Sequence, residues 1–321
     1  MNIALIEPLG IKEENISKFK NLVESLNHTF TYYNTKPHNE DDLINRIKDQ
    51  NIVIVANYPI SEKAIKEAKN LEYLNVAFTG LDHIPLNYIK ENNIYLTNAK
   101  GYSNISVSEQ VIGMTLALYR KLHLNDFITK SNKDSSIYGP GEEINGKTIG
   151  IIGLGEIGIK TAKLFEAFGA EVIYYSRTKK DVKYKYVELD ELLKTSDIIS
   201  LHIPSNEETY HFLNKEKLDL IKKDAILINT ARGKVIDNDY LAKLLNEDKI
   251  KGAAIDVFDY EPPLKDDYAL IHAKNVLLTP HTAFLTKEAL ERRAEIVFNN
   301  ILDYLYDKSF MSFMKLYLYV S

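Results

Sequence analysis

The chain has 321 residues, enough for two ordinary domains, because a single hydrophobic core stops growing at about 250–300 residues. Hydrophobic residues make up 45% and charged residues 26%, a composition typical of globular rather than disordered or membrane-embedded proteins. The net charge of −5 gives no sign of a nucleic-acid-binding surface, and the absence of cysteine excludes disulfides and a thiolate nucleophile. We therefore expect a cytoplasmic protein in a reducing environment.

No apolar run approaches the roughly 20 residues that a membrane span needs, so we expect no membrane partner. The opening MNIALIEPLG has no basic segment before its short apolar run, which indicates a strand rather than a signal peptide. The tail SFMSFMKLYLYVS is apolar but is interrupted by Lys315, and we expect it to pack against the body or a partner subunit.

Five short β-branched runs occur in the first hundred residues, each followed by a helical pattern. They cover residues 3–6, 29–33, 52–56, 73–77 and 95–97. Strand runs that alternate with helices predict βαβ units and a parallel sheet. The same alternation restarts at KTIGIIG, after a long apolar helix (VSEQVIGMTLALYRKL) and a polar, turn-rich stretch, which indicates a second α/β domain. The last helical pattern, KEALERRAEIVFNNILDYLY, could belong to either domain.

The most informative line is TIGIIGLGEIGIKTAKLFEAFG. A buried-strand run meets Gly153-x-Gly155-x-x-Gly158, with Glu156 and Ile157 in the pattern, and a helix follows. We expect Gly153 to make a tight turn, Gly155 to let the backbone approach a pyrophosphate, and Gly158 to allow close helix–strand packing. With a strand before it and a helix and strand after it, this pattern predicts a dinucleotide site at a helix N-terminus.

The next strand ends in YYSRTKK, where an NAD site usually has an acid for the adenosine ribose. This chain instead has Ser176, Arg177 and Thr178, whose two hydroxyl groups and planar guanidinium group suit a 2′-phosphate. The sequence therefore favours NADP over NAD. The alternative is a solvated basic turn, with the ribose held by the backbone.

Three later motifs each place ionisable residues just past a strand, where open α/β sheets bind ligands. These are Arg232 in INTARGKVID, Asp256 and Glu261 in AIDVFDYEPP, and His281 in LLTPHTAF. Reduction of a ketone by hydride needs a proton for the developing alkoxide, which a histidine supplies. A nearby carboxylate would hold the imidazolium, and an arginine fork would bind an α-carboxylate. Each residue alone has an ordinary structural explanation, but together they predict a 2-keto acid reductase. No histidine pair has metal-ligand spacing, so we expect no metal.

These motifs and SLHIPSNEETYHFLN, in this order, resemble the D-isomer-specific 2-hydroxyacid dehydrogenase family over nearly the whole chain. The resemblance implies that His281 is the acid/base, Glu261 its carboxylate partner and Arg232 the substrate anchor. It implies that the substrate carboxylate binds the backbone amides of Thr79 and Gly80. Tyr102 would lie near the substrate. A further set of residues would line the cofactor-binding site: His202, Pro204, Thr209, Thr230, Ala231, Asp256 and His281. Of these, Asp256 would contact the nicotinamide carboxamide.

The resemblance also implies two doubly wound parallel-sheet domains, a Rossmann dinucleotide-binding domain (100–286) inserted in a flavodoxin-like substrate domain (1–99, completed by 287–321). The VSEQVIGMTLAL helix would then lie near a two-fold interface, so we expect a homodimer. Departures from the family pattern include the absence of tryptophan and Pro85 where aspartate is common. PHTAF is similar to D-lactate dehydrogenases and YYSRT to glyoxylate and hydroxypyruvate reductases, so the substrate stays open.

Two other functions are compatible with parts of the sequence. A D-3-phosphoglycerate dehydrogenase would need basic residues in the N-terminal loops, and NYPIS and FTGLDHIP offer none. A non-enzymatic, dinucleotide-sensing binding module would tolerate loss of Arg232, Glu261 and His281, yet all three are present. We therefore favour an NAD(P)H-dependent oxidoreductase that interconverts a small 2-keto acid and its D-2-hydroxy acid.

Overall fold

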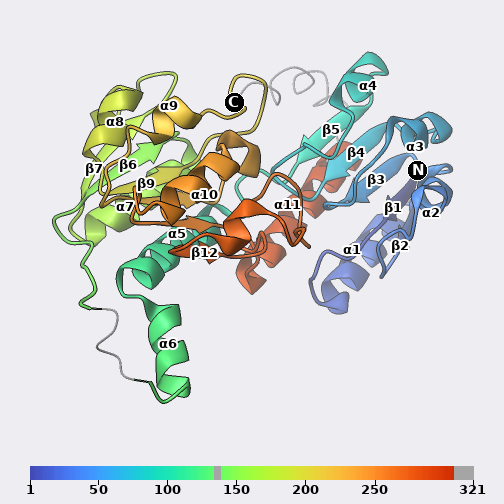
Figure 1. Cartoon of the computed structure of the whole chain (residues 1–321). Helices are drawn as coiled ribbons and strands as arrows, with labels where there is room; N and C mark the ends of the chain where they lie inside the picture. Colours follow the sequence, from blue (N-terminus) through green and yellow to red (C-terminus); the bar gives the residue numbers. More distant parts are fainter. Residues whose placement is uncertain (134–138, 307–321) are drawn as a thin grey trace. The chain divides into compact units, whose positions relative to one another are not determined.

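The computed structural model describes residues 1–133 and 139–306. Within them the chain divides into two compact units (Figure 1). Unit 1 consists of Met1–Ser103 and the chain from Thr286, and unit 2 is Asn104–Leu285. The apolar tail that was expected to pack against the body or a partner lies outside the described residues. No helix of the described part is both long and apolar enough to cross a membrane.

Unit 1 is built around a five-stranded sheet in the order β2-β1-β3-β4-β5, and every neighbouring pair is parallel. This is the flavodoxin-like doubly wound order. Its elements are β1 (Asn2–Leu5), α1 (Glu13–Ser25), β2 (Thr29–Tyr32), α2 (Glu40–Ile47), β3 (Ile52–Val55), α3 (Glu62–Glu67), β4 (Tyr73–Val76), α4 (Leu86–Glu91), β5 (Tyr95–Asn98) and α11 (Lys287–Tyr306). All four residues of β3 are buried, which explains why this strand is a continuous apolar run rather than an alternating one.

The C-terminal helix α11 belongs to unit 1 and packs against β4. One contact shows how closely the helix is fitted. Asn75 of β4 is fully buried, and its side-chain amide donates a 2.9 Å hydrogen bond to the carbonyl of Val297 in α11. The choice left open by the helical pattern alone is thus decided in favour of the N-terminal unit.

Unit 2 contains a seven-stranded parallel sheet in the order β12-β11-β10-β9-β6-β7-β8. Its elements are α5 (Asn104–Tyr119), α6 (Leu122–Lys130), β6 (Thr148–Ile152), α7 (Glu156–Ala167), β7 (Glu171–Tyr175), β8 (Lys185–Tyr186), α8 (Leu189–Thr195), β9 (Ile198–Leu201), α9 (Lys215–Leu218), β10 (Ile226–Asn229), η2 (Gly233–Val235), α10 (Asn238–Asn246), β11 (Gly252–Ile255), η3 (Ala269–His272) and β12 (Val276–Leu278). The predicted fold class, two parallel-sheet α/β domains of which one is a Rossmann domain, is confirmed.

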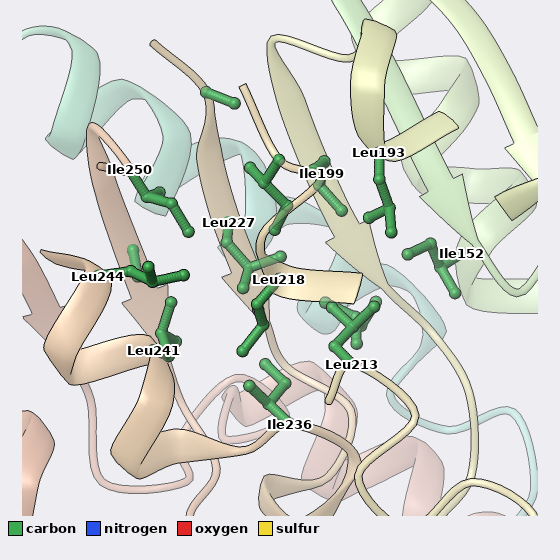
Figure 2. Close-up of a cluster of buried hydrophobic side chains, with 14 of the residues drawn as sticks. Ile152, Leu193, Ile199, Leu213, Leu218, Leu227, Ile236, Leu241, Leu244 and Ile250 are labelled. Carbon is green, nitrogen blue, oxygen red and sulfur yellow. The ribbon is translucent and has the colours of Figure 1, made fainter. Parts of the chain in front are cut away.

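Apolar clusters cover the sheet of unit 2. Figure 2 shows one of them, where side chains of the strands, such as Ile199 and Leu227, meet Leu193 of α8 and Leu241 of α10. A second cluster joins strand residues to α5 and α7, for example through Val111 and Phe165. Each fully buried side chain of this size stabilises the fold by about 1.5–3 kcal/mol. The rigid sheet therefore fixes the carboxyl ends of its strands, where the candidate site residues begin.

Candidate active site

The candidate cofactor residues of unit 2 follow the carboxyl ends of neighbouring parallel strands. Gly153 follows β6, His202 follows β9, Thr230 follows β10 and Asp256 follows β11, and His281 lies in the loop that begins after β12. Because the strands are parallel and in register, these positions lie together at the carboxyl-terminal end of the sheet. The chain leaves β6 toward β7 on one side and returns to β9 on the other, so this end contains the switch point at which such folds bind dinucleotides.

The glycines after β6 have the backbone conformation and the close surroundings that a pyrophosphate site requires. Gly153 has φ +95°, and an added Cβ would meet the carbonyl of His202. A Cβ on Gly158 would collide with the carbonyl of Gly153, so this glycine permits the close packing of α7 on β6. Gly155, by contrast, is exposed and has open space where its Cβ would be. The loop therefore fits a dinucleotide. A pyrophosphate can approach the backbone at Gly155, and any side chain at Gly153 or Gly158 would collide with neighbouring backbone.

The first turn of α7 presents its backbone N–H groups at this loop. Gly155 is the N-cap residue, and Ile159 is the first residue whose N–H is used within the helix, bonding to the carbonyl of Gly155. The N–H groups of Glu156, Ile157 and Gly158 are thus available for an anion, with the helix dipole favouring it. The carboxylate of Glu156 accepts a 2.5 Å hydrogen bond from the side-chain amide of Asn104.

The segment after β7 forms a basic turn with one acidic neighbour. The hydroxyl of Ser176 donates to the carbonyl of Thr178 at 2.7 Å and so closes the turn. Arg177 extends from it and pairs with Glu208 at 3.2 Å, with both side chains more than 70% exposed. An exposed pair of this kind is held weakly, by about 0–1 kcal/mol, so Arg177 remains able to turn toward a phosphate.

The loop after β9 contains His202 and Thr209. Nε2 of His202 lies 2.9 Å from the hydroxyl of Ser200, and burial lowers the pKa of His202 to about 4, so the ring is neutral at pH 7. The hydroxyl of Thr209 donates to the carbonyl of Pro204 at 2.7 Å and accepts from the N–H of Asn206 at 2.8 Å. Thr209 therefore shapes the loop that carries Pro204.

Arg232 lies in a turn that is fixed by the last residue of β10. The side chain of Asn229, which is fully buried, accepts from the N–H of Ala231 at 3.0 Å and donates to the carbonyl of Arg232 at 2.8 Å. Nη1 of Arg232 donates to the carbonyl of Ala231 at 2.8 Å. A Cβ on Gly233 would overlap the backbone of Phe258, so the turn packs directly on the segment after β11.

Asp256 organises the loop that carries His281. Its carboxylate accepts a hydrogen bond from the hydroxyl of Thr279 at 2.5 Å and from the N–H groups of Thr282 and Ala283, both at 2.9 Å. Burial raises the pKa of Asp256 above its usual range, and these three hydrogen bonds oppose that shift. The contact to a nicotinamide carboxamide that the resemblance implies stays a prediction.

His281 and Glu261 form a pair at this loop. Nδ1 of His281 lies 2.8 Å from Oε1 and 3.0 Å from Oε2 of Glu261. The histidine side chain is 21% exposed, whereas the glutamate is 74% exposed. His281 has φ +53°, and its ring meets that of Phe284 edge to face at 5.7 Å. With Nδ1 directed at the carboxylate, Nε2 is the ring atom that can exchange a proton with a ligand.

The candidate substrate residues lie in unit 1. Thr79 and Gly80 follow β4, and within the described residues their backbone N–H groups donate to no protein acceptor. The carbonyl of Thr79 is held by the side-chain amide of Asn98 at 2.9 Å. Tyr102 is 1% exposed, and its ring centre lies 6.0 Å from that of Phe78. Two free amide donors in one turn can bind a carboxylate.

Several residues that shape the site are not marked by the sequence patterns. They are Asn104, Ser200, Asn229, Asn206 and Glu208. Asn229 had the clearest signal, because an amide at the end of a buried strand often holds the following turn. Among the described residues, no cluster of three or more His, Asp or Glu side chains could hold a metal ion.

Comparison with known proteins decides the family. Residues 112–283 match the D-isomer specific 2-hydroxyacid dehydrogenase, NAD binding domain family. A glyoxylate reductase of Thermofilum pendens is 37% identical over 277 residues, which cover 83% of this chain and 81% of that protein. The chain belongs to the D-isomer specific 2-hydroxyacid dehydrogenases. It is an NAD(P)-dependent oxidoreductase that reduces 2-keto acids.

Two solved structures agree with this membership. An acyclic imino acid reductase, solved with NADPH and D-Arg, is 36% identical, with a TM-score of 0.86 over 95% of this chain and 97% of its own. A D-lactate dehydrogenase of Aquifex aeolicus, solved with NAD and lactic acid, is 30% identical, with a TM-score of 0.81 over 95% and 96%. The predicted family and the predicted enzyme class are thus confirmed.

Proposed function

We propose that this D-2-hydroxyacid dehydrogenase reduces a small 2-keto acid with His281 as the proton donor. The observation that carries the proposal is the 2.8 Å pair between Nδ1 of His281 and Glu261. The pair sits on a loop that Asp256 fixes at the carboxyl edge of the Rossmann sheet. Glu261 holds the imidazolium and orients the ring, so that Nε2 gives its proton to the substrate oxygen. In the reverse direction Nε2 takes the proton from the hydroxyl group.

The remaining candidate residues bind and orient. The guanidinium of Arg232 binds the α-carboxylate of the substrate and polarises its keto group. In unit 1, the proposal gives the backbone amides of Thr79 and Gly80 a carboxylate-binding role and Tyr102 a place near the substrate. When bound, the reduced nicotinamide supplies the hydride that completes the 2-hydroxy acid. Arg232 and His281, both in unit 2, thereby hold the keto group in one orientation, which gives a single D-product.

We propose that the cofactor is NADP rather than NAD. Residues 176–180 directly after β7 contain no carboxylate, and Arg177 is exposed and only weakly paired with Glu208. A relative of 36% identity was solved with NADPH, which supports the same preference. In this proposal the phosphate loop, from Gly153 to Gly158, holds the pyrophosphate while Arg177 binds the 2′-phosphate.

We also propose that the enzyme is a homodimer. The helix α5 carries the sequence that lies near the two-fold interface in the resembling family, and α6 follows it. Leu122 and Phe127 of α6 are 53% and 57% exposed, and in this proposal the partner subunit covers them. Light scattering of the purified protein tests this assembly. The expected cytoplasmic location stays a prediction.

A substrate panel tests the proposal directly. NADPH oxidation is followed with glyoxylate, hydroxypyruvate, pyruvate and a branched 2-keto acid, each alone and with added ammonia or methylamine. Turnover with a keto acid alone supports the proposal. Turnover only with amine present would indicate imino acid reduction, the activity named for the relative of 36% identity. The panel also includes 3-phosphohydroxypyruvate, and turnover with this substrate but none of the others would favour a D-3-phosphoglycerate dehydrogenase. No turnover on any member would favour a dinucleotide-sensing module.

A further inference from the structure

Arg293 is a buried arginine in the first half of α11, and the proposed chemistry does not use it. Only 5% of the residue is exposed. Its guanidinium carbon lies 5.9 Å from the ring centre of Phe78 and 5.8 Å from that of Tyr102. Both distances fall within the roughly 6 Å at which a cation is attracted to an aromatic ring, and burial strengthens that attraction.

The same helix is tied to three loops at the carboxyl edge of the unit 1 sheet. Nη2 of Arg293 donates to the carbonyl of Leu9, after β1, at 2.7 Å. The neighbouring Arg292 donates through Nε to the carbonyl of Tyr102, after β5, at 3.0 Å. Phe78 lies after β4. One short segment of α11 therefore reaches the ends of β1, β4 and β5.

Phe78 immediately precedes Thr79 and Gly80, whose amides are proposed to bind the substrate carboxylate. The carbonyl of Phe78 accepts from the N–H of Ala99 at 3.0 Å, and the carbonyl of Thr79 accepts from Asn98. These bonds join the loop after β4 to the loop after β5. The position of the Phe78 ring depends on what it packs against, and the guanidinium of Arg293 is one of its neighbours.

A buried carboxylate accompanies this arginine. Glu7 follows β1 and is fully buried, and its Oε1 atom accepts from the N–H groups of Ala56 and Tyr58 at 2.8 and 2.9 Å. Within the described residues, Oε2 of Glu7 and Nε of Arg293 have no hydrogen-bond partner. Burial lowers the pKa of Arg293, and the nearby Tyr102 and Glu7 oppose that shift. Burying a guanidinium and a carboxyl group that each keep one atom without a hydrogen-bond partner is costly, which argues that the cluster has a use beyond packing.

We propose that Arg293 is a positioning residue for the 2-keto acid: held by Leu9, it clamps the rings of Phe78 and Tyr102 and so fixes the Thr79–Gly80 amides. The proposal rests on the proposed substrate role of those amides. Arg293 itself does not touch the substrate. Its effect is to keep two N–H donors aimed at one carboxylate, which strengthens binding because their orientation is set in advance.

The test compares Arg293→Met with Arg46→Met. Met has a similar length and no charge. Arg46 is the matched control, since it is equally buried, lies 4.5 Å above the ring of Tyr33 and donates to the carbonyls of Ile6 and Thr35. Thr35 is remote from Thr79 and Gly80 in the sheet, because β2 is the edge strand at the far side from β5. Both variants lose a buried guanidinium over a ring. Arg46→Met also loses an ion pair with Asp42, whereas only Arg293→Met loses a contact to Phe78.

Two quantities are measured for each variant. The first is amide hydrogen exchange of peptides that cover residues 78–82 and 99–103, with a peptide covering 153–158 as internal reference. The second is the KM for the best 2-keto acid and the KM for NADPH. For Arg293→Met we expect about tenfold faster exchange in the two loop peptides and about tenfold higher keto acid KM, with the NADPH KM changed by less than about twofold. Arg46→Met should leave all of these near wild type.

Unchanged exchange and unchanged keto acid KM in Arg293→Met would overturn the proposal, as would equal changes in Arg46→Met. If Arg293→Met does not fold, Arg293→Lys replaces it. Lys keeps the charge but cannot stack on a ring as a planar guanidinium does and has fewer N–H donors. We therefore expect intermediate changes in the exchange rates of the same loops and in the keto acid KM. If the wild-type protein reduces no keto acid, the proposed function fails, while the exchange measurement still decides whether Arg293 holds the loop.

Discussion

Asp256 and His281 are joined through the backbone: the N–H of His281 donates to the carbonyl of Asp256 at 2.8 Å. The carboxylate of Asp256 accepts three more hydrogen bonds from the same loop. His281 has a positive φ, so its ring direction depends on this loop being held in one conformation. The strand β11 thus determines where the proposed proton donor lies.

Asp256→Asn should destabilise the loop that carries His281. Both carboxylate oxygens of Asp256 accept hydrogen bonds from backbone N–H groups, and in the variant the side-chain NH₂ group would face one of these donors. We expect the free energy of unfolding to fall by about 1–3 kcal/mol, together with a clear loss of kcat. The control is Asp259→Asn, whose carboxylate accepts from Asn238 and Tyr268 in the same unit. Urea unfolding and steady-state kinetics check both variants. Loss of kcat in Asp259→Asn of the same size would contradict the role of Asp256.

Glu261→Gln should reduce turnover less than loss of the histidine does. The glutamate is 74% exposed, so water can partly replace it, but a neutral amide does not hold an imidazolium. We expect kcat to fall by about tenfold, with partial recovery in Glu261→Asp. Stopped-flow measurement of the hydride step checks this. A rate for Glu261→Gln equal to the wild type would show that the pair with His281 has no role in the reaction.

Cofactor preference should respond to single changes around Arg177. Ser176→Asp places a carboxylate near the ribose and should lower the NADPH-to-NADH ratio of kcat/KM by at least about tenfold. Glu208→Gln releases Arg177 from its pair and should lower the NADPH KM by about two- to fivefold at low salt. The control is Glu207→Gln, which removes the same charge from the exposed residue next to Glu208. If the wild type already prefers NADH, the NADP proposal is wrong, although the reductase chemistry survives.

The neutral His202 should make stability depend on pH. Its pKa is lowered to about 4 in the fold from 6.5, so between these values the unfolded chain binds a proton that the folded chain does not. Stability is therefore full above pH 6.5 and is lost as pH falls toward 4, by at most about 3 kcal/mol. Urea unfolding at pH 7 and 4.5 checks this in wild type and His202→Gln. The variant should lose less, and the exposed-residue control His272→Gln should behave as wild type.

The sequence contained enough to predict the fold class, since short continuous apolar runs and the Gly153–Gly158 loop are local patterns. It could not predict the pairing of Arg177 with Glu208, because these residues are 31 positions apart and both lie in polar loops. The cluster of Arg293, Phe78 and Tyr102 was equally hidden. An arginine in a helical pattern is ordinarily exposed, and only the return of α11 to unit 1 buries this one.

The role of Asp256 shows a different limit. Its position after a strand marked it as a candidate, but a residue type cannot reveal which donors surround it. Three of its donors come from positions 23–27 residues later, in the loop that carries His281. Tertiary contacts of this kind depend on the order of β11 and β12 in the sheet.

Single-turnover kinetics of His281→Gln decide whether His281 donates the proton. The variant is mixed with NADPH and the best keto acid, and NADPH affinity is measured separately by fluorescence. We predict that the hydride step slows by about 10²- to 10⁴-fold, while the Kd for NADPH changes by less than about twofold. A His281→Gln variant that reduces the keto acid at nearly the wild-type rate would show that another group donates the proton.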